Sequence, residues 1–479
     1  MPITRKQQIL VQKETTESGG GPASWAGSQA IQVYDPSLSD TVDQLDRAPA
    51  GPTLSRDFTP VGRKQRELTF TSDFRGSGTP GTEPDWADLI EACGYKQDHA
   101  TSAVRLIKFD FAGDGASTGS FQLGEQITQD TGNDVGVVLG CFTSGHSPMT
   151  TASLTSDYMI VAEITGTLAT DTATTGASSA ATISTANVAV TTVHHTYMPT
   201  SDKLIQLTDS GNWELSPVAG NTVTIYRSTV IVGSAQVVAA TLTTTDVVLL
   251  WGEVATGDII KTGATTNGTL DAAPVMTRTP SLAFQHNLDG RNRQLNGARG
   301  TFTCDGEVGQ PMMFSWTFQG DIGTDADAVA LTTSGLSTTR APRLLGALCA
   351  FGSGSTLRTL QTKSISFDNG GTVSPNLDAN SSGGSTGANI TDRDSKCSVT
   401  VDNTLSTVDW ESLRDAGTAV RVAFVLGTTT GNIVSLVMPN CQVSEVSLSD
   451  SDGVSTMDLT LSPRRIAESG DDEIFFSQL

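Results

Sequence analysis

The sequence lacks closely spaced cysteines. Its six cysteines are scattered singly over 479 residues, and no two of them have the C-x2-C spacing of a zinc-ligand pair. They also do not resemble the dense disulfide framework of a small secreted scaffold. We therefore expect most of them to be small buried apolar side chains. The six are Cys93, Cys141, Cys304, Cys349, Cys397 and Cys441.

Charged residues and long apolar runs are also scarce. Only 17% of the residues are charged. No apolar run approaches the roughly 18 residues that are needed to span a bilayer. The opening residues, MPITRKQQILVQKE, lack the apolar stretch of a signal peptide. The sequence therefore predicts a soluble protein without a membrane segment, made in a reducing cytoplasm.

Cations are outnumbered by anions. Lys plus Arg number 29 and Asp plus Glu number 51, so the net charge is −22. Because proteins hold the phosphates of nucleic acids mainly with cations, this balance argues against a nucleic-acid-binding function. An acidic wall would still let DNA slide past without sticking, which leaves DNA open as a passing cargo.

Histidines are few, and no acid, base and nucleophile form a recognisable set. Of the five histidines, His194 and His195 are adjacent, and neighbours on a strand face opposite sides. The acidic stretches at 321–327 and 450–453 are expected to be turns. The second has part of a calcium-loop pattern but lacks its later glutamate, so structural calcium is the weaker alternative. We predict no catalytic, cofactor-binding or metal-binding residues, no cofactor, and a protein that is not an enzyme.

Three glycine patterns match enzyme motifs but stand in the wrong context. Residues 76–81, GSGTPG, match GxGxxG between an expected strand and an expected helix. Pro80 lacks the N–H that a phosphate would need, and no βαβ pattern follows, so a flexible turn is favoured over dinucleotide binding. Residues 115–119 and 383–387 match GxSxG, but both lie in Gly/Ser-rich tracts and are interpreted as loops.

The residues that the sequence does have favour strands and turns. Threonine, serine and glycine dominate the polar residues, and β-branched side chains are enriched. The clearest pattern is at 281–320, where apolar and polar residues alternate on both sides of a turn at 307–311. This predicts a β-hairpin with one buried face and one threonine-rich, solvated face. The buried face would carry Phe302, Cys304, Phe314, Trp316 and Phe318.

Similar alternation predicts further strands and two short helices. The expected strands are 31–34, 67–74, 364–367, 398–401, 420–426 and 457–461. The expected helices are 85–93, with Trp86, Leu89, Ile90 and Cys93 on one face, and 408–414, which Gly417 would end. Residues 35–60 and 370–395 lack periodicity and are expected to be long loops.

The composition of residues 113–269 differs from that of the rest of the chain. Thr, Ala and Gly dominate there, which predicts two or more inserted β modules. We divide the remainder into an N-terminal arm at 1–28 and a domain in two halves, 29–112 and 270–479. The arm begins basic and ends glycine-rich, and we expect it to be extended and ordered only by a partner.

Several motifs, in their order along the chain, resemble the major tail tube proteins of tailed bacteriophages. The resemblance covers about residues 1–110 and 270–479. The motifs are TRKQQILVQKE at 4–14, GRKQRELTF at 62–70 with ACGY at 92–95, LNGARGTF at 295–302 with FQG at 318–320, ITDR at 390–393, DGVS at 452–455 and GDDEIFF at 470–476.

That resemblance implies a fold, an assembly and a function. The fold would be a β-barrel or sandwich with short helices, interrupted here by a small exterior β insertion. Six copies would close a ring, and the rings would stack in the virion tail into a hollow tube, assembled in the host cytoplasm, that conducts the DNA genome during ejection. Tail tip or baseplate proteins and a tail terminator would be further partners. Residues 1–28 and 35–60 are the expected contacts between rings.

Two other function classes remain open at this stage. The Thr/Gly-rich β modules also suit a virion decoration or receptor-binding protein. A β-rich hydrolase acting on glycans is the third hypothesis, and its activity would depend on one of the acidic clusters.

Overall fold

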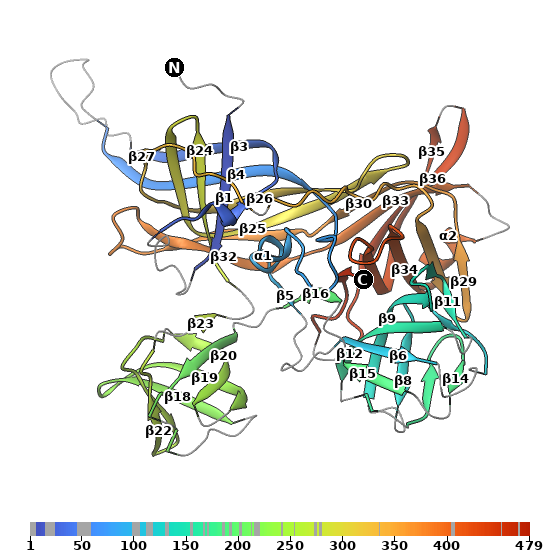
Figure 1. The fold of residues 1–479 in the computed structure, drawn as a ribbon, viewed down its shortest axis with the longest axis horizontal. Helices are drawn as coiled ribbons and strands as arrows, with labels where there is room; N and C mark the ends of the chain where they lie inside the picture. The colour runs from blue at the N-terminus through green and yellow to red at the C-terminus, as the bar shows by residue number, and fades with distance from the viewer. Residues whose placement is uncertain are drawn as a thin grey trace.

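The computed structural model confirms a nearly all-β chain (Figure 1). Among the described residues there are two short α-helices, and none is long and apolar enough to cross a membrane. The described residues are 6–14, 24–45, 59–97, 106–111, 118–129, 134–153, 157–165, 168–169, 172–183, 187–190, 194–200, 204–211, 213–214, 221–240, 243–252, 254–272, 275–276, 280–334, 336–403, 408–451, 453–467 and 470–479.

The largest sheet has 18 strands. Its strands come from both ends of the sequence, so chain segments far apart in sequence share one sheet. They are β1 (Gln7–Lys13), β2 (Ala30–Ile31), β3 (Tyr34–Gln44), β4 (Val61–Asp73), β5 (Tyr95–Gln97), β16 (His195–Pro199), β24 (Leu282–Leu288), β25 (Arg291–Glu307), β26 (Met313–Ile322), β27 (Ala326–Asp327), β28 (Leu348–Ser353), β29 (Thr356–Thr359), β30 (Thr362–Asp368), β33 (Lys396–Asp402), β34 (Ala419–Leu426), β35 (Val434–Ser451), β36 (Val454–Pro463) and β37 (Phe475–Gln478).

Strand β25 joins the two parts of this sheet. One edge of this 17-residue strand pairs with β26, which in turn pairs with β4. Its other edge pairs first with β24 and then with β30, which leads to β33, β36 and β35. The predicted hairpin at 281–320 is therefore confirmed as β25 and β26, with β24 before it. All five side chains expected on its inner face are buried.

The predicted helices are also confirmed. Helix α1 (Ala87–Glu91) buries the expected apolar stripe, and Gly94 follows it with φ of 89°, a conformation that glycine adopts without strain. Helix α2 (Trp410–Ala416) begins where the Asp409 carboxylate accepts a hydrogen bond from the Ser412 N–H, and it ends at Gly417 in the left-handed region. The strands expected at 67–74, 364–367, 398–401, 420–426 and 457–461 lie within or largely within β4, β30, β33, β34 and β36.

Both predicted long loops are wrong where the structure describes them. Residues 34–44 form β3, which pairs with β4, while residues 46–58 lie outside the described residues. Residues 370–395 contain a hairpin of β31 (Gly371–Leu377) and β32 (Ser385–Arg393). No residue of β31 is buried and the buried residues of β32 are small, so neither strand shows the apolar alternation by which strands are recognised in a sequence. The short strand expected at 31–34 is divided between β2 and the start of β3.

The N-terminal segment does not need a partner for order at residues 7–13. Strand β1 pairs with β24 along its whole length, and its Ile9 and Leu10 side chains are buried in the same chain. Residues 1–5 and 15–23 of the expected arm lie outside the described residues. A short 3-10 helix, η1 (Gly27–Gln29), precedes β2.

Two smaller β modules interrupt the large sheet. They are separated by β16, which pairs with β5 and β37 of the large sheet. The segment 113–269 therefore includes a strand of the large sheet.

The first module contains β6 (Leu106–Asp110), β7 (Phe121–Gln122), β8 (Gln126–Gln129), β9 (Asp134–Thr143), β10 (Pro148–Met149), β11 (Thr151–Ala152), β12 (Asp157–Thr165), β13 (Thr174–Gly176), β14 (Thr182–Ile183) and β15 (Asn187–Val190). The second contains β17 (Leu204–Thr208), β18 (Thr222–Arg227), β19 (Val230–Ala240), β20 (Thr244–Gly252), β21 (Ile259–Thr262), β22 (Thr265–Thr269) and β23 (Val275–Met276).

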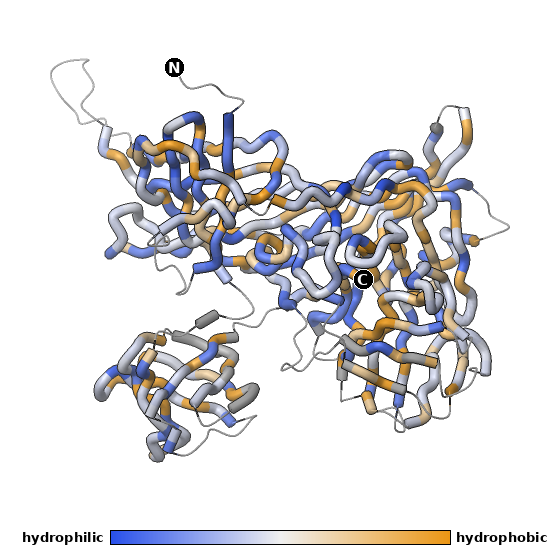
Figure 2. Tube along the Cα trace, in the orientation of Figure 1, coloured by the Kyte–Doolittle hydropathy of each residue, from blue (hydrophilic) through white to orange (hydrophobic). Residues whose placement is uncertain are grey.

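The two modules differ in how they meet the large sheet. In the first, Leu123 and Phe142 share a buried cluster with Val437 and Phe475 of the large sheet. The second has a core of its own around Trp213. Apolar and polar residues alternate along many strands of the sheet and of both modules, as Figure 2 shows. We infer that the first module is packed on the large sheet, whereas the second is a separately cored unit.

Candidate functional site

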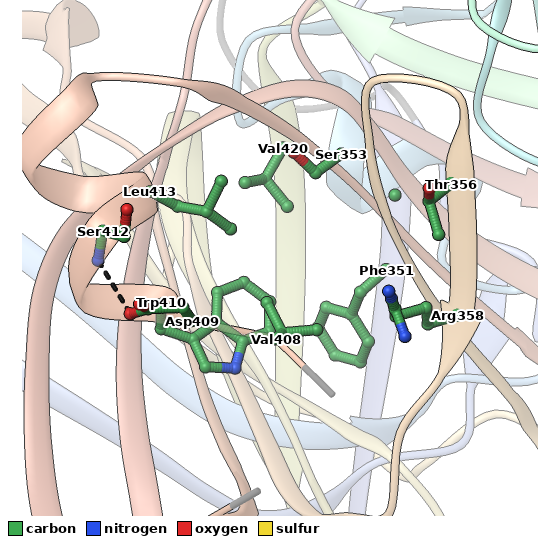
Figure 3. Close-up of a pocket in the computed structure, with 11 residues that line it drawn as sticks. Phe351, Ser353, Thr356, Arg358, Val408, Asp409, Trp410, Ser412, Leu413 and Val420 are labelled. Carbon is green, nitrogen blue, oxygen red and sulfur yellow. Dashed lines mark hydrogen bonds between the residues drawn. The ribbon is translucent and has the colours of Figure 1, made fainter. Parts of the chain in front are cut away.

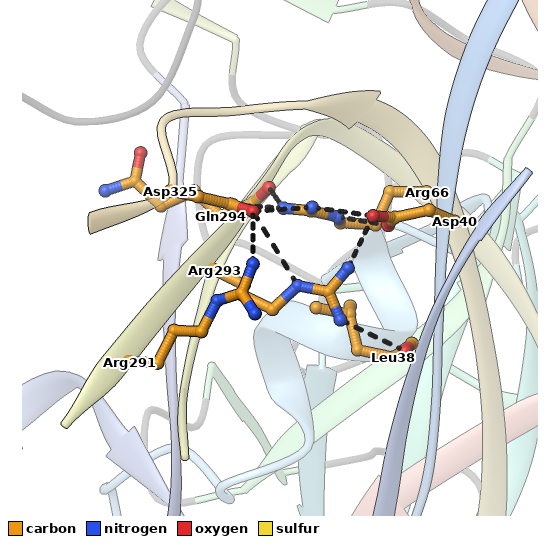
Figure 4. Close-up of polar contacts among 7 residues, drawn as sticks. All are labelled: Leu38, Asp40, Arg66, Arg291, Arg293, Gln294 and Asp325. Atoms are coloured by element: carbon orange, nitrogen blue, oxygen red, sulfur yellow. Dashed lines mark hydrogen bonds and ion pairs between the residues drawn. The ribbon is translucent and has the colours of Figure 1, made fainter. Parts of the chain in front are cut away.

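A buried arginine ties four segments of the large sheet together (Figure 4). The Arg66 side chain on β4 is only 1% exposed. Its guanidinium lies between two carboxylates: Nε is 2.6 Å from Asp40 Oδ1, and Nη1 is 2.7 Å from Asp325 Oδ1. Nη1 also donates to the Gln294 carbonyl at 2.7 Å. Such paired contacts fix orientation as well as charge.

Two further arginines, from β25, complete this arginine cluster. Arg293 donates to Asp40 and lies 3.8 Å from Asp325, and Arg291 lies 3.9 Å from Asp325. Three guanidinium groups thus face two carboxylates, so the cluster carries one net positive charge in an acidic protein. Hydrogen bonds from Arg66 hold the pKa of Asp40 below its ordinary value. Burial works against the ionised form of Asp325, but the Arg66 contacts outweigh it and lower the pKa.

The arginine cluster positions the start of a long segment, residues 323–347, which we call the strap; residue 335 lies outside the described residues. The strap leaves the sheet near β27 and next contacts β1, where the Gln8 side chain accepts from the Leu331 N–H and donates to the Leu331 carbonyl. Farther on, the Arg75 guanidinium donates to the Thr339 carbonyl at 2.9 Å. Between Asp325 and Leu331 the strap exposes Val329, whose side chain is 85% accessible.

An apolar pocket of about 300 Å³ lies beside α2 (Figure 3). Its apolar wall includes Trp410, Phe351 and Leu413; the first two rings meet edge to face with centroids 5.8 Å apart. Arg358, an exposed residue of β29, lies beside Phe351 on the side of the pocket opposite Leu413. The Asp409 carboxylate also lines it, but this group is engaged in capping α2. The pocket can accept an apolar side chain next to an anionic one.

An ion pair in which Glu91 is buried and Lys13 is partly exposed fastens β1 to α1. The Lys13 ammonium is 2.9 Å from both the Asp88 and the Glu91 carboxylates. Burial raises the pKa of Glu91 to about 7, although the Lys13 charge opposes that shift. Burial also opposes the charged form of Lys13, but the two carboxylates outweigh it and raise its pKa. The contact links the N-terminal strand to the helix that follows β4.

The glycines of the GxGxxG match are used in contacts within the chain. The Gly76 N–H donates to Asn432 Oδ1 at 3.0 Å, and the Gly78 N–H donates to the Gly431 carbonyl at 2.9 Å. A Cβ atom on Gly76 would lie 2.2 Å from the Gly431 carbonyl oxygen. These two N–H groups face a neighbouring loop, so they do not form a phosphate cradle. The turn that the sequence predicted is present, and it is packed against residues 431–432.

The GxSxG match at 383–387 runs into a strand. Ser385 begins β32, and its hydroxyl donates to the Asp321 carboxylate, which also accepts from the Gly387 N–H at 2.7 Å. A nucleophile elbow would need a helix after the serine. Residues 112–117, which hold most of the other match, lie outside the described residues.

The histidine pair lies where the first module meets β16. His195 Nδ1 hydrogen-bonds the Gln97 side chain at 2.9 Å. Burial, together with the nearby His146, lowers the pKa of His194 to about 4. Among the described residues, no three His, Cys, Asp or Glu side chains are grouped closely enough to hold a metal ion. The absence of a cofactor stays a prediction.

The acidic stretches and the cysteines have structural surroundings. Residues 321–327 are not a single turn as expected, because residues 321–322 end β26 and residues 326–327 form β27. Asp450 accepts from the Gly453 N–H at 3.1 Å and so closes the turn between β35 and β36. All six cysteines are free thiols, and all but the half-buried Cys349 are buried, as expected of small apolar side chains. Burial raises the pKa of the Cys397 thiol to about 12, so that thiol is largely un-ionised near neutral pH.

Sequence reasoning missed both the arginine cluster and the pocket. Arg66 and Asp325 are 259 residues apart, and nothing local to either residue indicates the other. The pocket joins β29 to α2 from positions that look like ordinary strand and helix residues. In comparisons with known proteins, no protein-family model matches this chain, and no curated protein resembles it significantly.

Proposed function

We propose that this chain is a structural subunit that closes into hexameric rings, which stack into the hollow tail tube of a tailed bacteriophage. The observation that carries the proposal is where its exposed apolar side chains lie. Leu448 and Val454, 66% and 54% exposed, lie near the end of the β35–β36 hairpin, which projects from the body in Figure 1. Leu45 and Val61 flank the gap between β3 and β4, and Val329 lies on the strap.

Such side chains are costly to leave in water on projecting segments. Exposed apolar side chains that gather into a patch mark interaction surfaces more often than apolar side chains scattered singly. In a ring these groups would be covered by neighbouring copies. The arrangement therefore supports an assembling subunit over a protein that works alone.

The edge of the large sheet supports the same proposal. Strand β3 is 11 residues long and, among the described strands, pairs only with β4. A long unpaired edge can accept a strand from another chain, and natural proteins cover or blunt such edges. A sheet that continues from one subunit to the next would cover β3. The order of the tail-tube-like motifs adds independent support from the sequence.

The charge balance suits a conduit for DNA. With a net charge of −22, the surface repels phosphates over the range at which counterions do not screen it. Genomic DNA would then pass as cargo without specific binding. The other tail proteins and the virion location belong to this same proposal.

Imaging the purified protein tests the proposal. We expect negative-stain electron microscopy to show rings with six-fold symmetry around a channel, and stacks of these rings at higher concentration. Labelled antibodies should mark the whole tail shaft of virions. Purified protein that stays monomeric at every concentration, together with virion tails that antibodies do not label, would reject it.

The second module favours one alternative, a virion decoration or receptor-binding protein. This module has its own core, and it exposes Val230 and Ile231 next to the turn between β18 and β19. An independently cored unit with an exposed apolar tip could bind a partner on a cell surface. In that case antibodies would label only the tail tip or the capsid surface.

A further inference from the structure

We propose that the strap of one copy docks into the apolar pocket of the next copy, with Val329 against Trp410 and Asp327 beside Arg358. This inference rests on the proposed ring assembly and names the contact that would join neighbouring subunits. It concerns the start of the strap near β27 and the pocket beside α2, which lie toward opposite ends of one copy.

The strap presents Val329 from a held position. Before it, Asp325 is clamped by Arg66; after it, Leu331 makes two hydrogen bonds with the Gln8 side chain. Val329 lies between these anchors and has the largest exposed fraction among the large apolar residues that the structure describes. A segment fixed at both ends loses little conformational freedom on docking, which favours binding. The exposed Val329 side chain is therefore held in position before it docks.

The pocket has the size and polarity to receive the Val329 side chain. Its volume of about 300 Å³ leaves room for a valine and part of its backbone. Trp410 is almost fully buried and supplies a rigid aromatic wall. Such aromatic anchors contribute disproportionately to binding at interfaces.

Charge complementarity favours the strap as the segment that occupies the pocket. In the part of the chain that the structure describes, no carboxylate pairs with Arg358, an exposed residue on the pocket's side opposite Leu413. Asp327 is also exposed and lies two residues before Val329. In an extended chain, residues two apart project from the same face about 6.6 Å apart. A strap laid across the pocket can therefore place an anion at Arg358 while the valine enters the apolar part.

The positions of the two surfaces suit a closed ring. Figure 1 places β27, where the strap begins, and α2 with β29, which line the pocket, toward opposite ends of the long axis. A contact between two different surfaces joins copies head to tail, and repetition of such a contact closes a ring when the rotation allows it. Within one copy, the Leu331–Gln8 contact holds the strap on β1, away from α2.

The main competing occupant is the β35–β36 hairpin of a second copy. Its Leu448 is also exposed, and Asp450 is two residues away. However, Asp450 is engaged in closing its own turn, and this hairpin projects from the same end of the molecule as the pocket. The strap therefore fits better, and Leu448 becomes the comparison in the test.

The test uses the full chain and exposed residues only. The variants are Val329→Asp, Asp327→Arg, Arg358→Asp and the double variant Asp327→Arg/Arg358→Asp. Val230→Asp is the matched control, because it places the same charge on an exposed apolar site of the second module, and Leu448→Asp probes the competing hairpin. Thermal unfolding checks that each variant is folded, and sedimentation velocity measures the concentration at which half of the protein is assembled.

We expect each of the three single strap or pocket variants to need an about tenfold higher concentration to assemble. The double charge reversal should recover most of that loss, because it restores the opposite pair across the interface. Val230→Asp should assemble like the unchanged protein, and Leu448→Asp should lose less than Val329→Asp. Rings that form equally well with Val329→Asp, a double variant without recovery, or a loss with Leu448→Asp alone would overturn the contact while leaving the ring assembly standing. If the unchanged protein does not assemble at all, the proposed function itself fails.

Discussion

The Asp325 carboxylate lies 2.7 Å from Nη1 of Arg66, a side chain that is almost completely buried. This contact joins the start of the strap to β4, across 259 residues of sequence. It fixes the direction in which the strap leaves the sheet. The contact therefore connects the internal packing of the large sheet with the surface that we propose for assembly.

Replacing Arg66 with methionine tests how much this contact contributes to the free energy of unfolding. The change leaves Asp40 and Asp325 without their main partner, so we expect a loss of about 3 kcal/mol, at the low end for a broken buried pair because both carboxylates are partly exposed. The midpoint of urea unfolding, followed by tryptophan fluorescence, measures it. Arg291→Ala is the control, because that exposed arginine lies 3.9 Å from Asp325 and should cost less than about 1 kcal/mol. Equal effects of the two changes would contradict the assignment.

The buried Glu91 predicts a pH dependence of stability. Its pKa is about 7 in the fold against an ordinary 4.5, so folding favours the protonated form. The resulting stability is fully present below pH 4.5 and is lost as the pH rises through about 7. Glu91→Gln removes this titration. The melting temperature of the variant minus that of the unchanged protein should therefore increase from pH 4.5 to pH 8.

A difference that stays constant or shrinks over that range would show that the pKa of Glu91 is not raised. Lys13→Met provides a second check, because it removes the positive charge that opposes the shift. In that variant, the pH at which stability is lost should move upward.

The turn at residues 76–81 predicts a steric effect at one glycine. Gly76→Ala places a Cβ atom 2.2 Å from the Gly431 carbonyl oxygen, so one of the two loops must move. We expect a loss of about 1–3 kcal/mol, as in other overpacked sites. Gly145→Ala is the matched control, because the nearest atom to its Cβ would be 3.8 Å away. Urea unfolding of both variants gives the comparison, and a neutral Gly76→Ala would show that the loops are not in contact.

Deleting the second module tests its independence from the large sheet. Removing residues 204–276, with a short Gly/Ser linker in their place, keeps β16 in the large sheet. We expect the shortened protein to fold and to assemble like the full chain. Circular dichroism and sedimentation velocity measure the two properties. A shortened protein that folds but does not assemble would place the second module in the tube wall.

The alternation of apolar and polar residues predicted those elements in which one face is buried and the other is exposed to solvent. Phe314, Trp316 and Phe318 are an example, because their period of two is a direct consequence of the pleat. Strand β3 was missed because its residues are mostly exposed, and the β31–β32 hairpin was missed because its few buried residues are small and form no apolar face.

Long-range relationships could not be predicted for a different reason. Neither Arg66 nor Asp325 has a neighbour in sequence that indicates its partner, and the pairing depends on the register between β4 and β26. Similarly, β16 is a five-residue strand within a Thr/Ala-rich region, and only its pairing with β5 and β37 assigns it to the large sheet.

The most direct measurement is negative-stain electron microscopy of the purified full-length chain over a range of concentrations, with sedimentation velocity on the same samples. The account predicts six-fold rings around a central channel that stack into tubes as the concentration rises. Particles that keep the mass of a single 50.0 kDa chain at every concentration, without rings, would contradict it.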